Sequence, residues 1–134
     1  MRVIITGGTG LSGRALAESL AADQHEAIGL SRAPERATSL PRGVRAERWD
    51  GRTVDGWGQL ADGAAAIVNL AGESIGGENM WALVTKRWTP DRRRMIRDSR
   101  VNSGAAVTQA VEAAQHRPRV VIQSSAVGYY GSHQ

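Results

Sequence analysis

The sequence predicts an α/β fold in which helices cover both faces of a parallel β-sheet. Short apolar, β-branched runs alternate along the chain with segments of helical spacing. One of these runs is apolar at nearly every position, which is typical of a strand in the centre of a parallel sheet, because helices bury both of its sides. Right-handed crossovers are then expected between successive strands.

The first half of the chain supplies three predicted strands and a helix. Residues 3–6 form an apolar run that ends in glycines, which predicts a buried strand leading into a turn. A helix is expected over residues 11–23, where apolar side chains recur at helical spacing. These side chains are Leu11, Ala15, Leu16 and Leu20. A second strand is predicted at residues 25–32, and a short third strand at 45–50.

The second half repeats the alternation. A brief helix is predicted at residues 57–63, and the near-continuous apolar strand follows at 64–73. A glycine-rich loop leads from there to a long helix, for which Thr89 is the expected N-cap, with Pro90 and Asp91 in the first turn.

This long helix should run to Val111 or beyond, with a possible break near Ser103 and Gly104. A last buried strand is expected at residues 120–123, directly before a pair of serines. The helix that would complete the pattern after this strand is not present in the sequence, so we expect the sheet to be truncated on its C-terminal side.

Composition narrows the function classes. The chain has 134 residues, and 41% of them are hydrophobic. We expect residues 1–134 to form one domain, or one incomplete domain that lacks a substrate-binding part. The chain has no cysteine and only three histidines, far apart in sequence, so we expect no metal site. Neither a leader nor a long apolar run is present, which predicts a cytoplasmic protein without a membrane partner.

The net charge of +4 raises the question of a nucleic-acid partner. The basic side chains are densest in residues 86–100, and their spacing circles most of the predicted long helix. Such a distribution favours a solvated helix surface. Because Trp88 is the single aromatic residue among these arginines, which is too little for base stacking, we expect no nucleic-acid partner.

The segment TGGTGLSG spaces three glycines by three residues between a predicted strand and a predicted helix. Gly7 allows a tight turn, Gly10 leaves room for a diphosphate, and Gly13 permits close packing of the helix. The free N–H groups of the helix and its positive dipole end then face the anion. This context predicts a dinucleotide-binding Rossmann domain, and the sequence Gly-Lys-Ser/Thr of a Walker-type loop does not follow.

TGGTGLSG resembles the fingerprint of the extended short-chain dehydrogenase/reductases. NLAGESIGG, RWTPDRRRMIRDSRV and SSAVGYYG follow in the chain, starting at Asn69, Arg87 and Ser124. Together these segments resemble an atypical branch, the NAD(P)-dependent epimerase/dehydratase family whose bacterial members are often labelled nucleoside-diphosphate-sugar epimerases. The resemblance covers essentially the whole chain. It implies a small-molecule substrate, with nucleotide sugars as one candidate class.

The end of the second predicted strand indicates which dinucleotide is bound. An NAD site usually has an acid there, which binds the ribose hydroxyls. This chain has Ser31 and Arg32 instead, and a guanidinium beside a hydroxyl suits a 2′-phosphate. We therefore predict NADP as the cofactor, with NAD less favoured. The alternative is that Arg32 is a solvated residue at the start of a loop.

The resemblance implies further cofactor contacts. Leu70, Ala71 and Gly72 would pass close beneath the cofactor ribose, where small residues are needed, and Leu11 belongs to the same turn as the glycines. Trp49 and Asp50 lie where the superfamily contacts adenine, although Trp49 suits the core equally well. Glu73 is expected either to reach a ribose hydroxyl or to cap the next turn. Arg100 is a candidate for contacting phosphates.

The resemblance also implies the chemistry, which is hydride transfer at a carbon that bears a hydroxyl or carbonyl. Ser125, with Ser124 as the alternative, would hydrogen-bond the reacting oxygen. A tyrosine followed four residues later by a lysine would act as acid/base. That pair is absent, because Tyr129 is followed by His133 and Tyr130 by Gln134.

Two readings of the chain follow. It is the N-terminal part of a longer epimerase or oxidoreductase, or it is a non-catalytic NADP-sensing or protein-interaction module. The first reading is favoured, because in the family the tyrosine and lysine fall on the next helix. Oligomeric state stays open.

Overall fold

The computed structural model describes residues 1–71 and 90–125. Five strands form one sheet in the order β3-β2-β1-β4-β5, and every neighbouring pair is parallel. Their bounds are Arg2–Thr6 for β1, Glu26–Ser31 for β2, Val44–Arg48 for β3, Ala66–Asn69 for β4 and Val120–Gln123 for β5. The chain moves outward from β1 to β3 and then returns to the other side of β1. The structure therefore confirms the predicted doubly wound parallel sheet.

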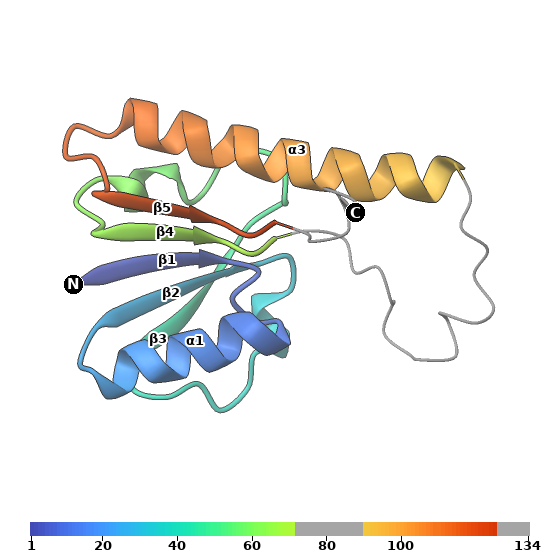
Figure 1. The fold of residues 1–134 in the computed structure, drawn as a ribbon. Helices are drawn as coiled ribbons and strands as arrows, with labels where there is room; N and C mark the ends of the chain where they lie inside the picture. Colours follow the sequence, from blue (N-terminus) through green and yellow to red (C-terminus); the bar gives the residue numbers. More distant parts are fainter. Residues whose placement is uncertain (72–89, 126–134) are drawn as a thin grey trace, which may run out of the picture.

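Helices cover the two faces of this sheet. Helix α1 (Leu11–Ala22) packs mainly on β2, while α3 (Pro90–Ala113) follows the side of β4 and β5 (Figure 1). Two 3₁₀ turns, η1 (Pro34–Arg36) and η2 (Gly58–Ala61), complete the described elements, and η2 packs against α3. In the described part of the chain, no helix combines the length and the apolar character needed to cross a bilayer.

Alternate residues of each strand face opposite layers of the core, as the two-residue period of a strand requires. Ile4, Ile28 and Ile67 belong to the cluster beneath α3 and η2, which also contains Trp49 and Trp57. Val3, Ile5, Ala27 and Val68 belong to the cluster beneath α1. β1 and β4 are therefore apolar on both sides, which is the pattern the sequence analysis used to predict a parallel sheet.

Helix α1 differs from the prediction in the face that it buries. Gly13 and Ala17 are buried, and Leu16 and Leu20 pack beside them against the sheet. Leu11 and Ala15, which the spacing analysis grouped with these leucines, are exposed, and 93% of Leu11 is accessible. The close approach of Gly13 to the turn before the helix fixes the helix rotation, so the residues three, four and seven positions after Gly13 face inward.

Helix α3 is continuous, so the expected break near Ser103 and Gly104 does not occur. The buried Ser103 hydroxyl donates a hydrogen bond to the Arg100 carbonyl at 3.0 Å, which satisfies it within the helix. A single glycine in a helix costs only about 1 kcal/mol relative to alanine, which the packing of α3 offsets. The predicted N-cap, Thr89, lies outside the described residues.

Strand β5 has the predicted bounds, but the prediction that it is buried is wrong. Val120, Val121 and Ile122 are 49%, 46% and 52% exposed. β5 pairs with β4 on one side only and forms an edge of the described sheet. Its apolar sequence matches that of a buried strand, but it lacks the second neighbour and the covering layer of one.

Candidate functional site

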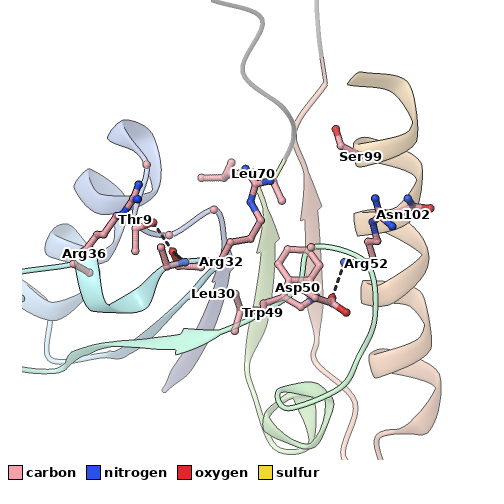
Figure 2. Close-up of a pocket in the computed structure, with 18 of the residues that line it drawn as sticks. Thr9, Leu30, Arg32, Arg36, Trp49, Asp50, Arg52, Leu70, Ser99 and Asn102 are labelled. Atoms are coloured by element: carbon pink, nitrogen blue, oxygen red, sulfur yellow. Dashed lines mark hydrogen bonds between the residues drawn. The ribbon is translucent and has the colours of Figure 1, made fainter. Parts of the chain in front are cut away.

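A pocket of about 1230 Å³ lies where the carboxyl ends of the strands meet. It is lined by the turn after β1, the end of β2, the loop after β3, the end of β4 and the N-terminal half of α3 (Figure 2). In a doubly wound sheet, ligands bind at this edge, beside the point where the strand order reverses. Here the order reverses next to β1. The pocket therefore occupies the position where the fold binds a ligand.

The glycine turn forms one wall of the pocket. Gly7 has a φ of +69°, a left-handed conformation that glycine adopts without strain, and its N–H donates to the Leu30 carbonyl at 3.1 Å. The Gly10 N–H then donates to the Gly7 carbonyl at 3.0 Å, which closes the turn. Gly7 and Gly10 both line the pocket, as the sequence analysis expects of a turn that leaves its backbone bare.

The N-terminus of α1, the positive end of the helix dipole, has neither a capping side chain nor an acidic residue in its first turn. Gly10 is the N-cap. The N–H groups that begin a helix have no acceptor within the helix. These donors and the positive end of the helix dipole can therefore meet an external anion, and the binding of a diphosphate there stays a prediction.

Two glycine contacts hold this turn against its surroundings. A Cβ on Gly13 would lie 2.4 Å from the Gly7 carbonyl oxygen, so α1 packs directly on the turn. A Cβ on Gly8 would lie 2.4 Å from the Cα of Gly29 in β2. The sequence analysis missed this second contact. A lone glycine within the apolar run of β2 was the available signal, since glycine inside a strand often marks a close backbone approach.

At the end of β2, Ser31 and Arg32 line the pocket, and their contact with a 2′-phosphate stays a prediction. The Ser31 hydroxyl oxygen accepts hydrogen bonds from the Ala33 N–H and from the Thr9 hydroxyl, each at 3.1 Å. Arg48 in β3 braces the following loop by donating to the Arg32 carbonyl at 2.9 Å and to the Glu35 carboxylate at 2.7 Å. The loop is therefore held on the glycine turn by one contact and on β3 by two others.

The loop after β3 forms the wall opposite the glycine turn. The Asp50 carboxylate accepts hydrogen bonds from the backbone N–H groups of Thr53 and Arg52 at 2.8 Å, and these bonds lower the pKa of Asp50. Trp49 belongs to the core and its indole N–H donates to the Thr53 carbonyl, while the residue also lines the pocket. The structure thus gives Trp49 the core role that the sequence analysis left open, and a contact of Asp50 with adenine stays a prediction.

The end of β4 lies directly over the glycine turn. A Cβ on Gly7 would be 3.4 Å from the Ala71 nitrogen and from the Leu70 carbonyl group. Leu70 and Ala71 line the pocket, and their contact with the cofactor ribose stays a prediction. The Thr6 hydroxyl accepts a hydrogen bond from the Ala71 N–H at 3.0 Å, which fixes this approach.

A buried polar network, which the sequence analysis missed, lies beneath the pocket. The amide of Asn69 accepts a hydrogen bond from the Thr6 hydroxyl and donates to Gln123 at 2.7 Å and to Ser103 at 3.4 Å. Asn69, Thr6 and Ser103 are 0%, 0% and 1% exposed. The network joins β1, β4, β5 and α3 at the carboxyl edge. The sequence signal for this network was Asn69, a polar residue in the otherwise apolar strand β4, because a buried polar group needs hydrogen-bond partners.

Replacing Asn69 with alanine (Asn69→Ala) is expected to lower the free energy of unfolding by about 2–4 kcal/mol. The substitution removes a buried amide and leaves buried partners unsatisfied. The matched control is Thr108→Val, which removes an exposed hydrogen bond from the Thr108 hydroxyl to the Gly104 carbonyl on the surface of α3. It should lower the free energy of unfolding by less than about 0.5 kcal/mol. Urea unfolding measures both changes, and equal losses would contradict a structural role for the network.

The other predicted residues in the described part of the chain do not line this pocket. Gly13 packs beneath it, and the exposed Leu11 side chain is not part of its lining. Ser125 follows β5 and is exposed, while the backbone N–H of Ser124 donates to the Asn69 carbonyl at 3.0 Å. Arg100, in α3, does not line the pocket. Gly72, Glu73, Tyr129 and Tyr130 lie outside the described residues.

Comparison with known proteins identifies a family and a shared fold. The family model described as "NAD dependent epimerase/dehydratase family" matches residues 3–134. The chain is 33% identical over 140 residues to the epimerase family protein SDR39U1 homolog, chloroplastic, of Arabidopsis thaliana. It is 31% identical over 141 residues to the epimerase family protein YfhF of Bacillus subtilis. In each case 98% of this chain is covered, but only 36% and 40% of the relatives, so the chain spans well under half of their length.

Among solved structures, the human epimerase family protein SDR39U1 (isoform 2) with NADPH superposes with a TM-score of 0.73 at 28% identity. The match covers 99% of this chain and 39% of the human chain. A UDP-galactose 4-epimerase superposes with a TM-score of 0.68 at 20% identity, over 98% of this chain and 40% of the other. This second likeness shows the fold alone.

Proposed function

Because the chain belongs to the NAD-dependent epimerase/dehydratase family, we propose that it is the NADP-binding part of an epimerase or oxidoreductase that acts at a hydroxyl or carbonyl carbon. One observation carries the proposal: a turn of bare backbone, followed by a helix without a capping side chain, opens into a large pocket at the carboxyl edge of the sheet. This is the arrangement that binds a diphosphate.

The glycine turn fits such a cofactor. A Cβ on Gly10 would contact only the Gly7 carbonyl oxygen, at 3.3 Å, so a side chain there would extend into the pocket. The diphosphate would rest on the backbone of Gly10 and the first turn of α1, and Gly7, Leu70 and Ala71 would lie close to the ribose. Gly72, Leu11 and Gly13 complete the proposed cofactor segment, Gly13 by packing beneath it and Leu11 through its backbone.

The choice of NADP over NAD rests on Ser31 and Arg32. Both residues line the pocket at the end of β2, and neither is the acid that an NAD site usually has there and that would repel a 2′-phosphate. The human relative, at 28% identity, was crystallised with NADPH, which supports the same choice here. Bound NADP would supply or accept a hydride at its nicotinamide. On the substrate side, Ser125 would donate a hydrogen bond to the reacting oxygen.

The substrate is proposed to be a small molecule, with nucleotide sugars as a candidate class. The cytoplasm is the proposed location. The acid/base pair expected of the family is absent from these residues, so catalysis is proposed for the longer protein of which residues 1–134 form one incomplete, nucleotide-binding domain.

The cofactor choice is tested by calorimetric titration of the full-length protein with NADP and NAD. The unmodified protein should bind NADP at least about tenfold more tightly, as one charge-assisted contact to the 2′-phosphate allows. Arg32→Asp should weaken NADP binding at least about thirtyfold, because it replaces attraction with repulsion. Arg42→Asp, the same charge reversal at an exposed site outside the pocket, should leave both affinities unchanged. Equal affinities of the unmodified protein for the two nucleotides would contradict the choice.

A further inference from the structure

Beyond Ser31 and Arg32, the wall of the pocket between β2 and the glycine turn contains two residues whose positions suit a phosphate. These are Thr9, which lies in the glycine turn itself, and Arg36, which ends the η1 turn. Both line the pocket, and Figure 2 shows them beside the glycine turn, with Arg32 reaching toward Leu70 between them and the side formed by Asp50 and α3. Thr9 follows β1 and Arg36 follows β2, and the fold brings the two residues to the same end of the pocket.

The hydrogen bonds of Ser31 determine what its hydroxyl can do. A serine oxygen has two acceptor sites and one proton to donate. The oxygen of Ser31 already accepts from the Thr9 hydroxyl and from the Ala33 N–H, each at 3.1 Å. Its acceptor sites are therefore occupied, and its O–H is left to donate to an acceptor in the pocket. A phosphate oxygen, which only accepts, matches this arrangement.

Arg36 is placed to supply a second positive charge. Its neighbour Glu35 is engaged by Arg48, whose guanidinium lies 2.7 Å from the Glu35 carboxylate. A backbone hydrogen bond lowers the pKa of Glu35 most, Arg48 lowers it further, and the charge of Arg36 contributes least. Across residues 1–71 and 90–125, no ion pair includes Arg36. The close partner of Glu35 is therefore Arg48 on the β3 side, and the Arg36 guanidinium, which forms no ion pair with Glu35, can meet an anion in the pocket.

The loop that carries these groups is held in place without a ligand. Arg48 donates to the Arg32 carbonyl at 2.9 Å, and the Arg36 N–H donates to the Ala33 carbonyl at 3.1 Å. The hydrogen bond from Thr9 to Ser31 ties the same loop to the glycine turn. Preorganised donors of this kind bind with a smaller ordering cost.

We infer that Thr9 and Arg36 determine the preference for a 2′-phosphorylated nucleotide. Thr9 is a positioning residue that holds the Ser31 hydroxyl as a donor, and Arg36 is a second guanidinium for the 2′-phosphate. The inference rests on the proposed function, since it concerns one end of the proposed NADP site. It adds that the glycine turn contributes to the choice of nucleotide through a side chain, in addition to binding the diphosphate through its backbone.

The test uses the full-length protein and four nucleotides: NADP, NAD, adenosine 2′,5′-bisphosphate and 5′-AMP. Thr9→Val keeps the shape of the side chain but removes its hydroxyl, and it should weaken NADP binding about fivefold, as expected for one lost hydrogen bond. Affinity for NAD should stay within about twofold, because NAD has no 2′-phosphate. Thr9→Ser restores the hydroxyl and should restore NADP affinity. The bisphosphate should follow NADP in every variant, and 5′-AMP should follow NAD.

Arg36→Gln should weaken NADP binding about tenfold or more and leave NAD unchanged, because it removes one charge-assisted contact. Arg42→Gln is the matched control, since Arg42 is exposed and does not line the pocket. A purely structural role for Thr9 or Arg36 would weaken NADP and NAD together, and that result would overturn the inference.

The outcomes separate the inference from the proposed function. If the unmodified protein binds neither dinucleotide, the proposed function fails and the inference fails with it. If it prefers NADP and Arg32→Asp abolishes this preference, but Thr9→Val and Arg36→Gln retain it, then the inference alone is wrong. A preference for NADP that falls in both variants and returns in Thr9→Ser supports the inference.

Discussion

Replacing Gly10 with valine (Gly10→Val) is expected to weaken NADP binding at least about a hundredfold while the protein stays folded. Gly10 has a φ of −72° and a ψ of 172°, an extended conformation that any residue adopts. A Cβ there would meet only the Gly7 carbonyl oxygen, at 3.3 Å, so the turn can accommodate it with a small shift. The rest of the side chain would fill the space above the first turn of α1, where the diphosphate is proposed to lie.

Calorimetric titration with NADP measures the loss, and circular dichroism verifies the fold. The matched control is Ala15→Val, which adds the two valine methyl groups to the exposed face of α1, away from the pocket. The control should bind NADP as the unmodified protein does. An affinity of Gly10→Val within about threefold of the unmodified protein would show that no diphosphate rests on this turn.

Replacing Gly13 with alanine (Gly13→Ala) is expected to lower the free energy of unfolding by about 3 kcal/mol, the upper part of the range for overpacking. The added Cβ would lie 2.4 Å from the Gly7 carbonyl oxygen and 2.7 Å from the Gly8 Cα. Both contacts are with backbone atoms, which cannot rotate away as a side chain can. Helix α1 would have to move away from the glycine turn. This movement would also separate the buried face of the helix from the sheet.

Gly104→Ala is the matched control, because Gly104 lies within α3 and a Cβ there would meet nothing within 4 Å. With no clash, the substitution should raise stability by about 0.5–1 kcal/mol through helix propensity alone. The same exchange thus has opposite signs in the two helices. Chemical unfolding measures both, and a stability gain for Gly13→Ala would contradict the close packing of α1 on the turn.

The order and type of the elements followed from local patterns. β5 has the predicted bounds because Val120 to Gln123 is a β-branched run between a proline-containing turn and a serine pair. Its exposure was not predictable, since the same apolar run suits a buried strand and an edge strand. Only the strand order, in which β5 pairs with β4 alone, distinguishes the two.

The candidate site was predictable where a local motif carries it. Gly7, Gly10, Ser31 and Arg32 line one pocket because each lies at or shortly after the end of a strand, and the carboxyl ends of parallel strands meet at one edge. Contacts between segments far apart in sequence were missed, such as Gly8 on Gly29 and Thr9 on Ser31. Gly29, a lone glycine in an apolar run, signals a close approach, but the partner in each contact depends on the spacing of β1 and β2 and on the path of the turn, which a short stretch of sequence does not show.

The central claim is that a dinucleotide diphosphate rests on the backbone N–H groups between Gly10 and Gly13. The most direct test is an NMR titration of the ¹⁵N-labelled protein with NADP, followed at its backbone amides. The account predicts that the largest shifts occur at the amides of the glycine turn and the first turn of α1, with a second group at Ser31 and Arg32. Saturable binding that leaves the amides of the glycine turn unchanged, or no binding at all, would contradict it.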